Sequence, residues 1–168
     1  QHAVLQQLDS LLLQQRTFAV AAIRLKNFSD WADMLGFGEA GQLFESISQS
    51  LMQASRPYGA LAYLANELFI LTMPAAVTEV EVHQQLTEIL QKVRQPFMHQ
   101  SQVLRPLFTV TYCMAPEDGD SAKLLLNNVL TSNRMHLHSP HAFFMRFSAG
   151  DADKKRQQLR ISDALFRA

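Results

Sequence analysis

The sequence predicts an α/β sandwich, one domain with a central mixed sheet and helices on both faces of the sheet. Two observations support this prediction. Nearly all-apolar segments of strand length, such as residues 17–25, alternate with segments whose apolar residues recur at helical spacing, such as residues 78–93. In addition, a chain of 168 residues with 48% hydrophobic and 18% charged residues is long enough and apolar enough to bury its own core.

The first half of the chain divides into six predicted elements. Apolar residues at helical spacing, such as Val4 and Leu8, predict helices, whereas continuous apolar runs bounded by turn residues predict strands. Gly36 and Gly38 are expected to end a short helix, and Pro57 and Gly59 to end a longer one before a hairpin. In chain order we expect a helix over residues 3–15, a strand over 17–25, and helices over 29–35 and 40–55. Two hairpin strands within 60–73 are expected to be joined by a turn over residues 64–67.

The second half is predicted to continue the alternation. Pro106 lies inside an apolar run and is expected to delay or bulge that strand, because proline cannot donate to a strand ladder. In chain order we expect a helix over residues 78–93, a strand over 102–114, a helix over 121–133, a short strand over 142–147 and a terminal helix from residue 151. The sheet would therefore be mixed and mainly antiparallel.

Composition excludes several functional classes. Fifteen basic and fifteen acidic residues cancel, so no basic excess attracts a nucleic acid. The apolar runs are much shorter than the roughly 20 residues of a membrane span, so this segment is expected to make no direct membrane contact. The single cysteine, Cys113, excludes an internal disulfide and fits a cytoplasmic domain. His136, His138 and His141 lack a neighbouring cysteine or carboxylate, so we expect no metal there. No cofactor is expected elsewhere in the chain.

Three motifs carry a resemblance to a known family. The first is I-R-L-K-N-F-S-D-W-A-D-M-L-G-F-G-E-A-G over residues 23–41. The second is the hairpin segment A-L-A-Y-L-A-N-E-L-F-I-L-T-M over residues 60–73, and the third is F-T-V-T-Y-C-M-A-P-E-D-G-D over residues 108–120. Over roughly residues 3–150, the chain resembles the GGDEF domain, the diguanylate cyclase module of bacterial cyclic di-GMP signalling. The resemblance implies a palm like that of the nucleotidyl cyclases.

The same resemblance implies that the catalytic site has been lost. In the family, carboxylates of the first strand and of the hairpin hold two divalent metals that activate GTP. Here Arg24 replaces the first-strand acid, and one hairpin acid, Glu67, remains. Several further family positions have also changed, which leads us to expect no catalytic or cofactor-binding residue. The hairpin motif reads Leu64, Ala65, Asn66, Glu67 and Leu68, the guanine-reading positions are Ala32 and Gly41, and the product-inhibition positions are Ser55 and Tyr58.

The C-terminal segment suggests a longer protein. The chain starts at Gln1 without a methionine and ends inside a helical pattern at Ala168, which indicates a fragment. Residues 151–168 resemble the connector of GGDEF–EAL tandem proteins, so we expect residues 1–150 to form the domain and 151–168 to lead to an EAL domain.

The expected role is regulatory. The domain would pack against the EAL domain, mediate dimerisation and relay an upstream signal in an inner-membrane, biofilm-regulating cyclic di-GMP phosphodiesterase. Two alternatives stay open, a module that senses GTP and a scaffold whose EAL domain is also inactive.

Overall fold

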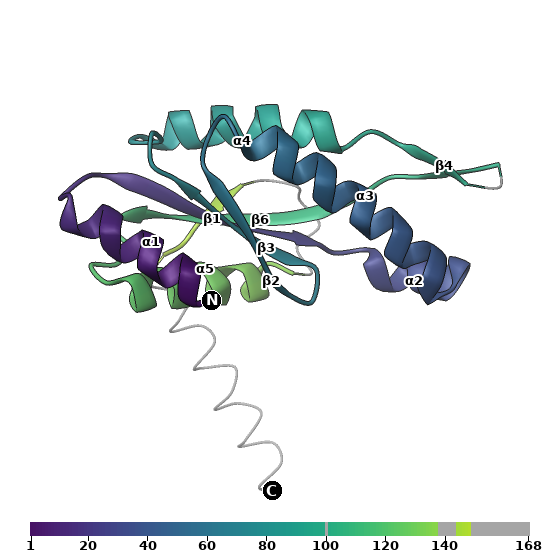
Figure 1. Ribbon diagram of the computed structural model, residues 1–168, viewed down its shortest axis with the longest axis horizontal. Helices are drawn as coiled ribbons and strands as arrows, with labels where there is room; N and C mark the ends of the chain where they lie inside the picture. Colours follow the sequence, from purple (N-terminus) through teal and green to yellow (C-terminus); the bar gives the residue numbers. More distant parts are fainter. Residues whose placement is uncertain (100, 138–143, 149–168) are drawn as a thin grey trace, which may run out of the picture.

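The computed structural model describes residues 1–99, 101–137 and 144–148, and it has the predicted fold class (Figure 1). The strands of the main sheet lie in the order β2-β3-β1-β6-β7, with antiparallel pairing except between β6 and β7. The sheet is therefore mixed and mainly antiparallel, as predicted. Its strands are β1 (Phe18–Leu25), β2 (Ala60–Ala65), β3 (Leu68–Met73), β6 (Phe108–Ala115) and β7 (Met145–Arg146).

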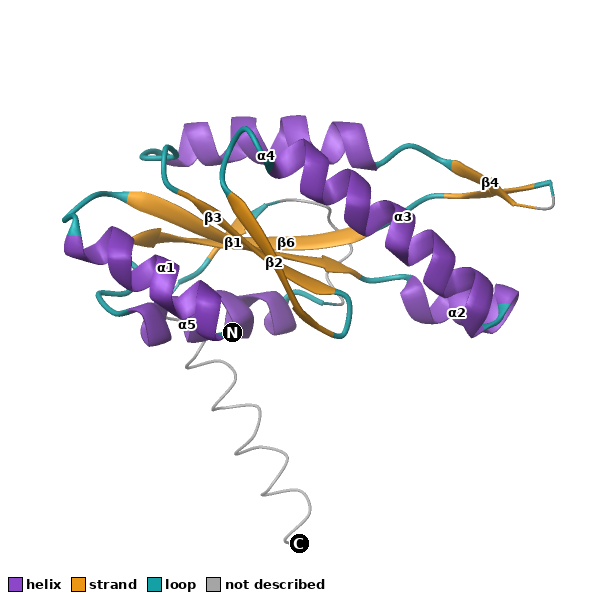
Figure 2. Ribbon diagram, viewed as in Figure 1, coloured by secondary structure: helices purple, strands orange, loops and turns teal. Residues whose placement is uncertain are grey.

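Helices cover both faces of this sheet (Figure 2). Alternate residues of β1 face opposite ways: Ala21 and Ile23 belong to one buried cluster, and Val20 and Ala22 to the other. The first cluster includes residues of α2, α3 and α4, and the second includes residues of α1 and α5. The helices are α1 (His2–Leu13), α2 (Phe28–Leu35), α3 (Phe37–Ser55), α4 (Glu79–Val93) and α5 (Ala122–Met135).

Local chemistry explains where several helices begin and end. The side chains of Thr78 and Ser121 accept hydrogen bonds from backbone N–H groups in the first turns of α4 and α5. Gly36, with a φ of 86°, separates α2 from α3 in a conformation that L side chains rarely adopt. Gly38, predicted to break the same helix, instead lies inside the first turn of α3, because only one such residue is needed to redirect the chain.

The strand predicted over residues 102–114 is divided into β5 (Gln102–Leu104) and β6, which begins only at Phe108. β5 pairs with β4 (Phe97–His99) in a separate hairpin. The side chain of Asn27 fixes the segment between β5 and β6. Its Nδ2 donates to the Arg105 carbonyl at 2.8 Å, and its Oδ1 accepts from the Leu107 amide at 3.1 Å. Pro106 therefore interrupts the strand rather than bulging it.

The C-terminal predictions are covered only in part. Of the strand predicted over residues 142–147, the described residues contain the two-residue β7, which pairs in parallel with β6. The helix predicted from Asp151 lies outside the described residues. Among the helices that are described, none combines the length and the apolar character that a membrane span requires.

Candidate functional site

The hairpin turn consists of Asn66 and Glu67 alone. Both residues have positive φ, 52° and 61°, as in the two-residue type I′ turns that match the twist of the flanking strands. The turn predicted over four residues is therefore too long. Leu64 and Ala65 belong to β2, and Ala65 pairs with Leu68 across the hairpin. The hairpin thus closes without a glycine, with a register shift between Tyr63 and Ala65.

Arg24, near the end of β1, is anchored by a residue far away in the sequence. Its Nε donates to Asn133 Oδ1 on α5 at 3.1 Å, and its Nη1 donates to the Asn66 carbonyl of the turn at 3.0 Å. Asn133 is fully buried, and its Nδ2 donates to the carbonyls of Ala22 and Thr109, at 3.1 Å each. The guanidinium therefore links the sheet, α5 and the hairpin turn.

The charge at this position is positive. Burial lowers the pKa of Arg24 most, the carboxylate of Glu67 raises it, and nearby Arg134 lowers it. A guanidinium nevertheless remains protonated at neutral pH. A metal ion close to Arg24 would meet this fixed positive charge.

A cleft of about 310 Å³ lies beside the turn, and we call it the hairpin cleft. The structure brings three of the sequence-predicted site residues, Arg24, Asn66 and Glu67, together here. Two cations and one carboxylate line it, a poor set of ligands for divalent metals, which prefer several carboxylate oxygens. The lining residues are Arg24, Leu25, Lys26, Phe28, Ser29, Asn66, Glu67 and Leu137.

The other predicted positions do not line this cleft. Ala32, on α2, is buried in the core, and Gly41 lies within α3, where an added side chain would meet open space. Ser55 is buried, and its hydroxyl donates to the Leu51 carbonyl at 2.7 Å. The Tyr58 hydroxyl donates to the carboxylate of Glu88 on α4. Ser55 and Tyr58 thus make contacts within the fold.

The histidine cluster gains no metal-binding geometry from the described part of the chain. Nδ1 of His136 lies 2.8 Å from the Ser132 carbonyl, a contact within the end of α5. His138 and His141 lie outside the described residues. Within residues 1–99, 101–137 and 144–148, no three histidine, cysteine or acidic side chains converge as metal ligands would.

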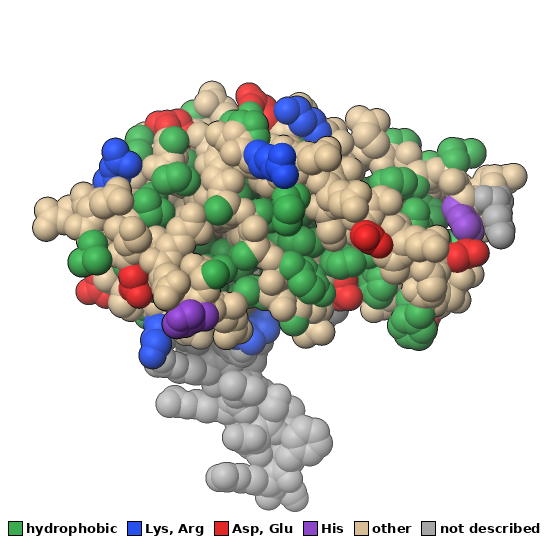
Figure 3. Space-filling view, in the orientation of Figure 1, with side chains coloured by type: hydrophobic (Ala, Val, Ile, Leu, Met, Phe, Trp, Pro, Cys, Tyr) green, Lys and Arg blue, Asp and Glu red, His purple; other side chains and the backbone are tan. Residues whose placement is uncertain are grey.

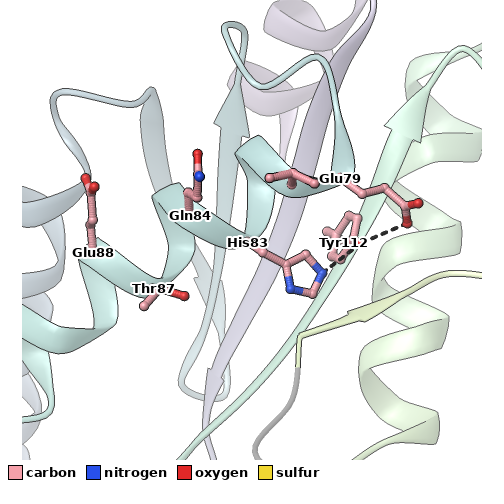
Figure 4. Close-up of a pocket in the computed structure, with 7 residues that line it drawn as sticks. Glu79, His83, Gln84, Thr87, Glu88 and Tyr112 are labelled. Carbon is pink, nitrogen blue, oxygen red and sulfur yellow. Dashed lines mark hydrogen bonds between the residues drawn. The ribbon is translucent and has the colours of Figure 1, made fainter.

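A second concave site, which the sequence analysis missed, runs along α4 (Figure 4). This α4 groove has a volume of about 680 Å³ and lies on the side of the helix that faces solvent. The spacing of its α4 residues, three and four apart, is the sequence signal that could have marked one exposed face. The lining residues are Glu79, Val80, His83, Gln84, Thr87, Glu88 and Tyr112.

A hydrogen-bonded chain crosses one end of the α4 groove (Figure 4). The Tyr112 hydroxyl donates to Glu79 Oε1 at 3.0 Å and lies 3.0 Å from His83 Nε2. Arg146 then forms ion pairs with Glu79 at 3.4 Å and Asp118 at 2.8 Å. Burial, followed by the bond to Glu79, raises the pKa of Tyr112, so the phenol stays protonated and does not act as a base. These hydrogen bonds and ion pairs connect α4 to β6 and β7.

Comparisons with solved structures agree with this architecture. The GGDEF domain of TpbB, also called YfiN, from Pseudomonas aeruginosa superimposes with a TM-score of 0.82 at 14% identity, over 93% of this chain and 94% of that chain. An EAL/GGDEF domain protein from M. capsulatus gives a TM-score of 0.68 at 20% identity, over 83% and 92%. The diguanylate cyclase SiaD from Pseudomonas aeruginosa, solved with its activator SiaC, gives 0.74 at 14% identity, over 86% and 57%.

Sequence comparison assigns the family. A search of curated proteins gives no significant match. The family model described as "Diguanylate cyclase, GGDEF domain" matches residues 1–137, which include the β2–β3 hairpin, β1, β6 and α5. The chain belongs to the GGDEF domain family of cyclic di-GMP signalling proteins.

Proposed function

We propose that this GGDEF domain has no diguanylate cyclase activity and serves as a regulatory module of a cyclic di-GMP signalling protein. The observation that carries the proposal is the anchored guanidinium of Arg24, because the resemblance puts a metal-binding acid at this position. Asn133 and the Asn66 carbonyl hold the cation at the end of β1. To make room for a metal ion, Arg24 would have to break both hydrogen bonds.

The composition of the hairpin cleft supports the same proposal. Joining two GTP molecules requires divalent metals that neutralise the phosphates and the developing charge. Asn66 offers a neutral amide, and Glu67 alone cannot hold a pair of metals. The Leu64 side chain lies where the family has a glycine, and it packs toward the cluster beneath α1 and α5.

We expect the purified chain to form no cyclic di-GMP from GTP with Mg²⁺ or Mn²⁺. The measurement is product formation over hours by chromatography, with an active diguanylate cyclase as the positive control. Product that appears with this chain and disappears in Glu67→Ala would show that the remaining carboxylate supports catalysis, and it would refute the proposal.

Calorimetry on the same sample separates an inactive domain from a GTP sensor. We expect no GTP binding tighter than about 1 mM, which corresponds to about 4 kcal/mol of binding free energy. A micromolar constant that weakens in Leu64→Asp would instead place GTP beside the hairpin. The domain would then be a nucleotide sensor without turnover.

The regulatory role that we propose acts on a neighbouring domain. Residues 1–150 would form the GGDEF domain, and residues 151–168 a helical connector to a C-terminal EAL domain with phosphodiesterase activity. The protein would be a biofilm regulator anchored in the inner membrane, with this domain on the cytoplasmic side. Support comes from the likeness to an EAL/GGDEF protein and from the apolar positions Ile161 and Leu165 at helical spacing.

Weakening the connector is expected to lower phosphodiesterase turnover of the longer protein by about fivefold, a small allosteric coupling. The variants are Leu165→Asp and a flexible Gly/Ser insertion after Gly150, because a continuous helix transmits orientation better than a flexible linker. Lys154→Asp, on the charged part of the segment, is the matched control. Unchanged turnover and unchanged oligomeric state in both test variants would reduce the connector to a spacer, and a longer protein without any turnover would favour the scaffold.

A further inference from the structure

The outer edge of β2 has the features of a strand that pairs with another chain. β2 is the end strand of the sheet, and within the described residues no strand pairs with its outer side. In an antiparallel ladder every second residue points its N–H and C=O away from its neighbour, so β2 presents unpaired backbone groups along this edge. Exposed edges of this kind are usually interrupted by charge or proline.

The sequence of β2 does little to protect this edge. Its six residues, A-L-A-Y-L-A, include no charge and no proline. Ala60, Tyr63 and Ala65 are exposed, Tyr63 by 49% of its surface. The register shift near Leu64 is the one irregularity, and it leaves Ala60–Tyr63 as a regular run. Uncharged, apolar edge strands without proline are those most prone to edge pairing.

The surroundings of β2 are also apolar. Figure 3 shows the face on which β2 lies: hydrophobic side chains occupy much of its centre, and charged side chains lie around them. Met52 on the neighbouring helix α3 is 44% exposed. Tyr63 packs against Phe44 and Phe69, with ring centroids 5.7 Å and 5.2 Å away, so its ring is held in place at the edge. A docking strand would therefore meet a preformed apolar border.

We propose that the β2 edge pairs antiparallel with β2 of a second copy of this chain. Charge decides between the two directions of pairing. Arg56, exposed, lies at the end of α3 in the turn that leads into β2, and Glu67 lies in the turn that follows β2. An antiparallel pair puts each Arg56 close to the Glu67 of the other copy, whereas a parallel pair would put like charges together. Two-fold symmetry then forms this contact twice.

Small side chains suit such a pairing. The alanines at positions 60, 62 and 65 leave room for two backbones to approach, and Leu61 and Tyr63 can pack across the joint with Met52. The result would be one continuous sheet through both copies. This inference deepens the proposed regulatory role, because it gives the dimer a surface. A monomeric protein would refute it and would leave the cyclase result unaffected.

The test is sedimentation of the full chain from about micromolar to about millimolar concentration, a range that includes weak dimers. We expect a dimer within this range. Arg56→Glu alone and Glu67→Arg alone should each weaken it by about tenfold, and the double exchange should restore it. Lys92→Glu, with the same charge change on an exposed turn of α4, is the control and should leave the dimer unchanged.

Amide exchange of the unmodified chain gives an independent measurement. Protection in residues 60–65 should increase with protein concentration, because pairing covers the outward amides of β2. A chain that stays monomeric to about millimolar concentration would overturn the inference. So would a dimer that tolerates both single exchanges, or one that forms without added protection in β2.

Discussion

Replacing Asn133 by alanine is expected to lower the free energy of unfolding by about 3 kcal/mol, one of the two largest effects that we predict. Asn133 is fully buried and makes three hydrogen bonds, to Arg24 and to the carbonyls of Ala22 and Thr109. Alanine would leave both carbonyls and part of the guanidinium without these partners. Urea denaturation followed by circular dichroism measures the change.

Asn128→Ala is the matched control for this result. It is the same exchange on the same helix, so the change in helix propensity is equal in the two variants. Asn128 is half-buried and donates one hydrogen bond, to the Asp118 carbonyl at 2.8 Å. We expect a loss of about 1 kcal/mol. If Asn133→Ala costs no more than this control, the anchor of Arg24 contributes little to the fold.

Gly59→Ala is expected to lower the free energy of unfolding by about 3 kcal/mol, because a new methyl group would overlap backbone that cannot move freely. A Cβ at Gly59 would lie 1.8 Å from the Thr72 carbonyl oxygen of β3, well inside van der Waals contact. To relieve this overlap, the start of β2 has to move away from β3. Urea denaturation measures the loss, and amide exchange should show that β2 opens first.

Gly41→Ala controls for the change in chain entropy. Gly41 lies inside α3, where an added Cβ meets no other atom within 4 Å. Alanine is the better helix former, so this variant should be more stable by about 0.5–1 kcal/mol. Opposite signs for the two glycine variants would locate the effect in the contact between Gly59 and Thr72. Equal small effects would show that the hairpin can shift at little cost.

Much of the fold follows from local patterns in the sequence. β1 and β6 were predicted because both segments are rich in apolar and β-branched residues, and both strands are buried on two faces. The β4–β5 hairpin was missed because its strands have three residues each, too few to show a period of two. The break at Pro106 also depends on the side chain of Asn27, about 80 residues earlier, which no local pattern reveals.

The candidate site, like the fold, could be predicted from the sequence only in part. The sequence alone gives Arg24, Leu64 and Ala65 at the positions where the resemblance implies an acid and two glycines. The partner of Arg24 could not be predicted, because Asn133 lies 109 residues away and comes close only when α5 packs on the sheet. The groups around Tyr112 likewise come from α4, β6 and β7, which only the fold brings together.

The bonding of Asn133 also limits which side chains position 24 can hold. Both hydrogens of its amide nitrogen are engaged by strand carbonyls, so only its oxygen faces position 24. A carboxylate introduced there by Arg24→Asp would meet an acceptor rather than a donor, and two acceptors facing each other in a half-buried place repel. Arg24→Asp alone is therefore disfavoured, and an acid at position 24 is easier to accommodate when the residue at position 133 presents a hydrogen-bond donor to it.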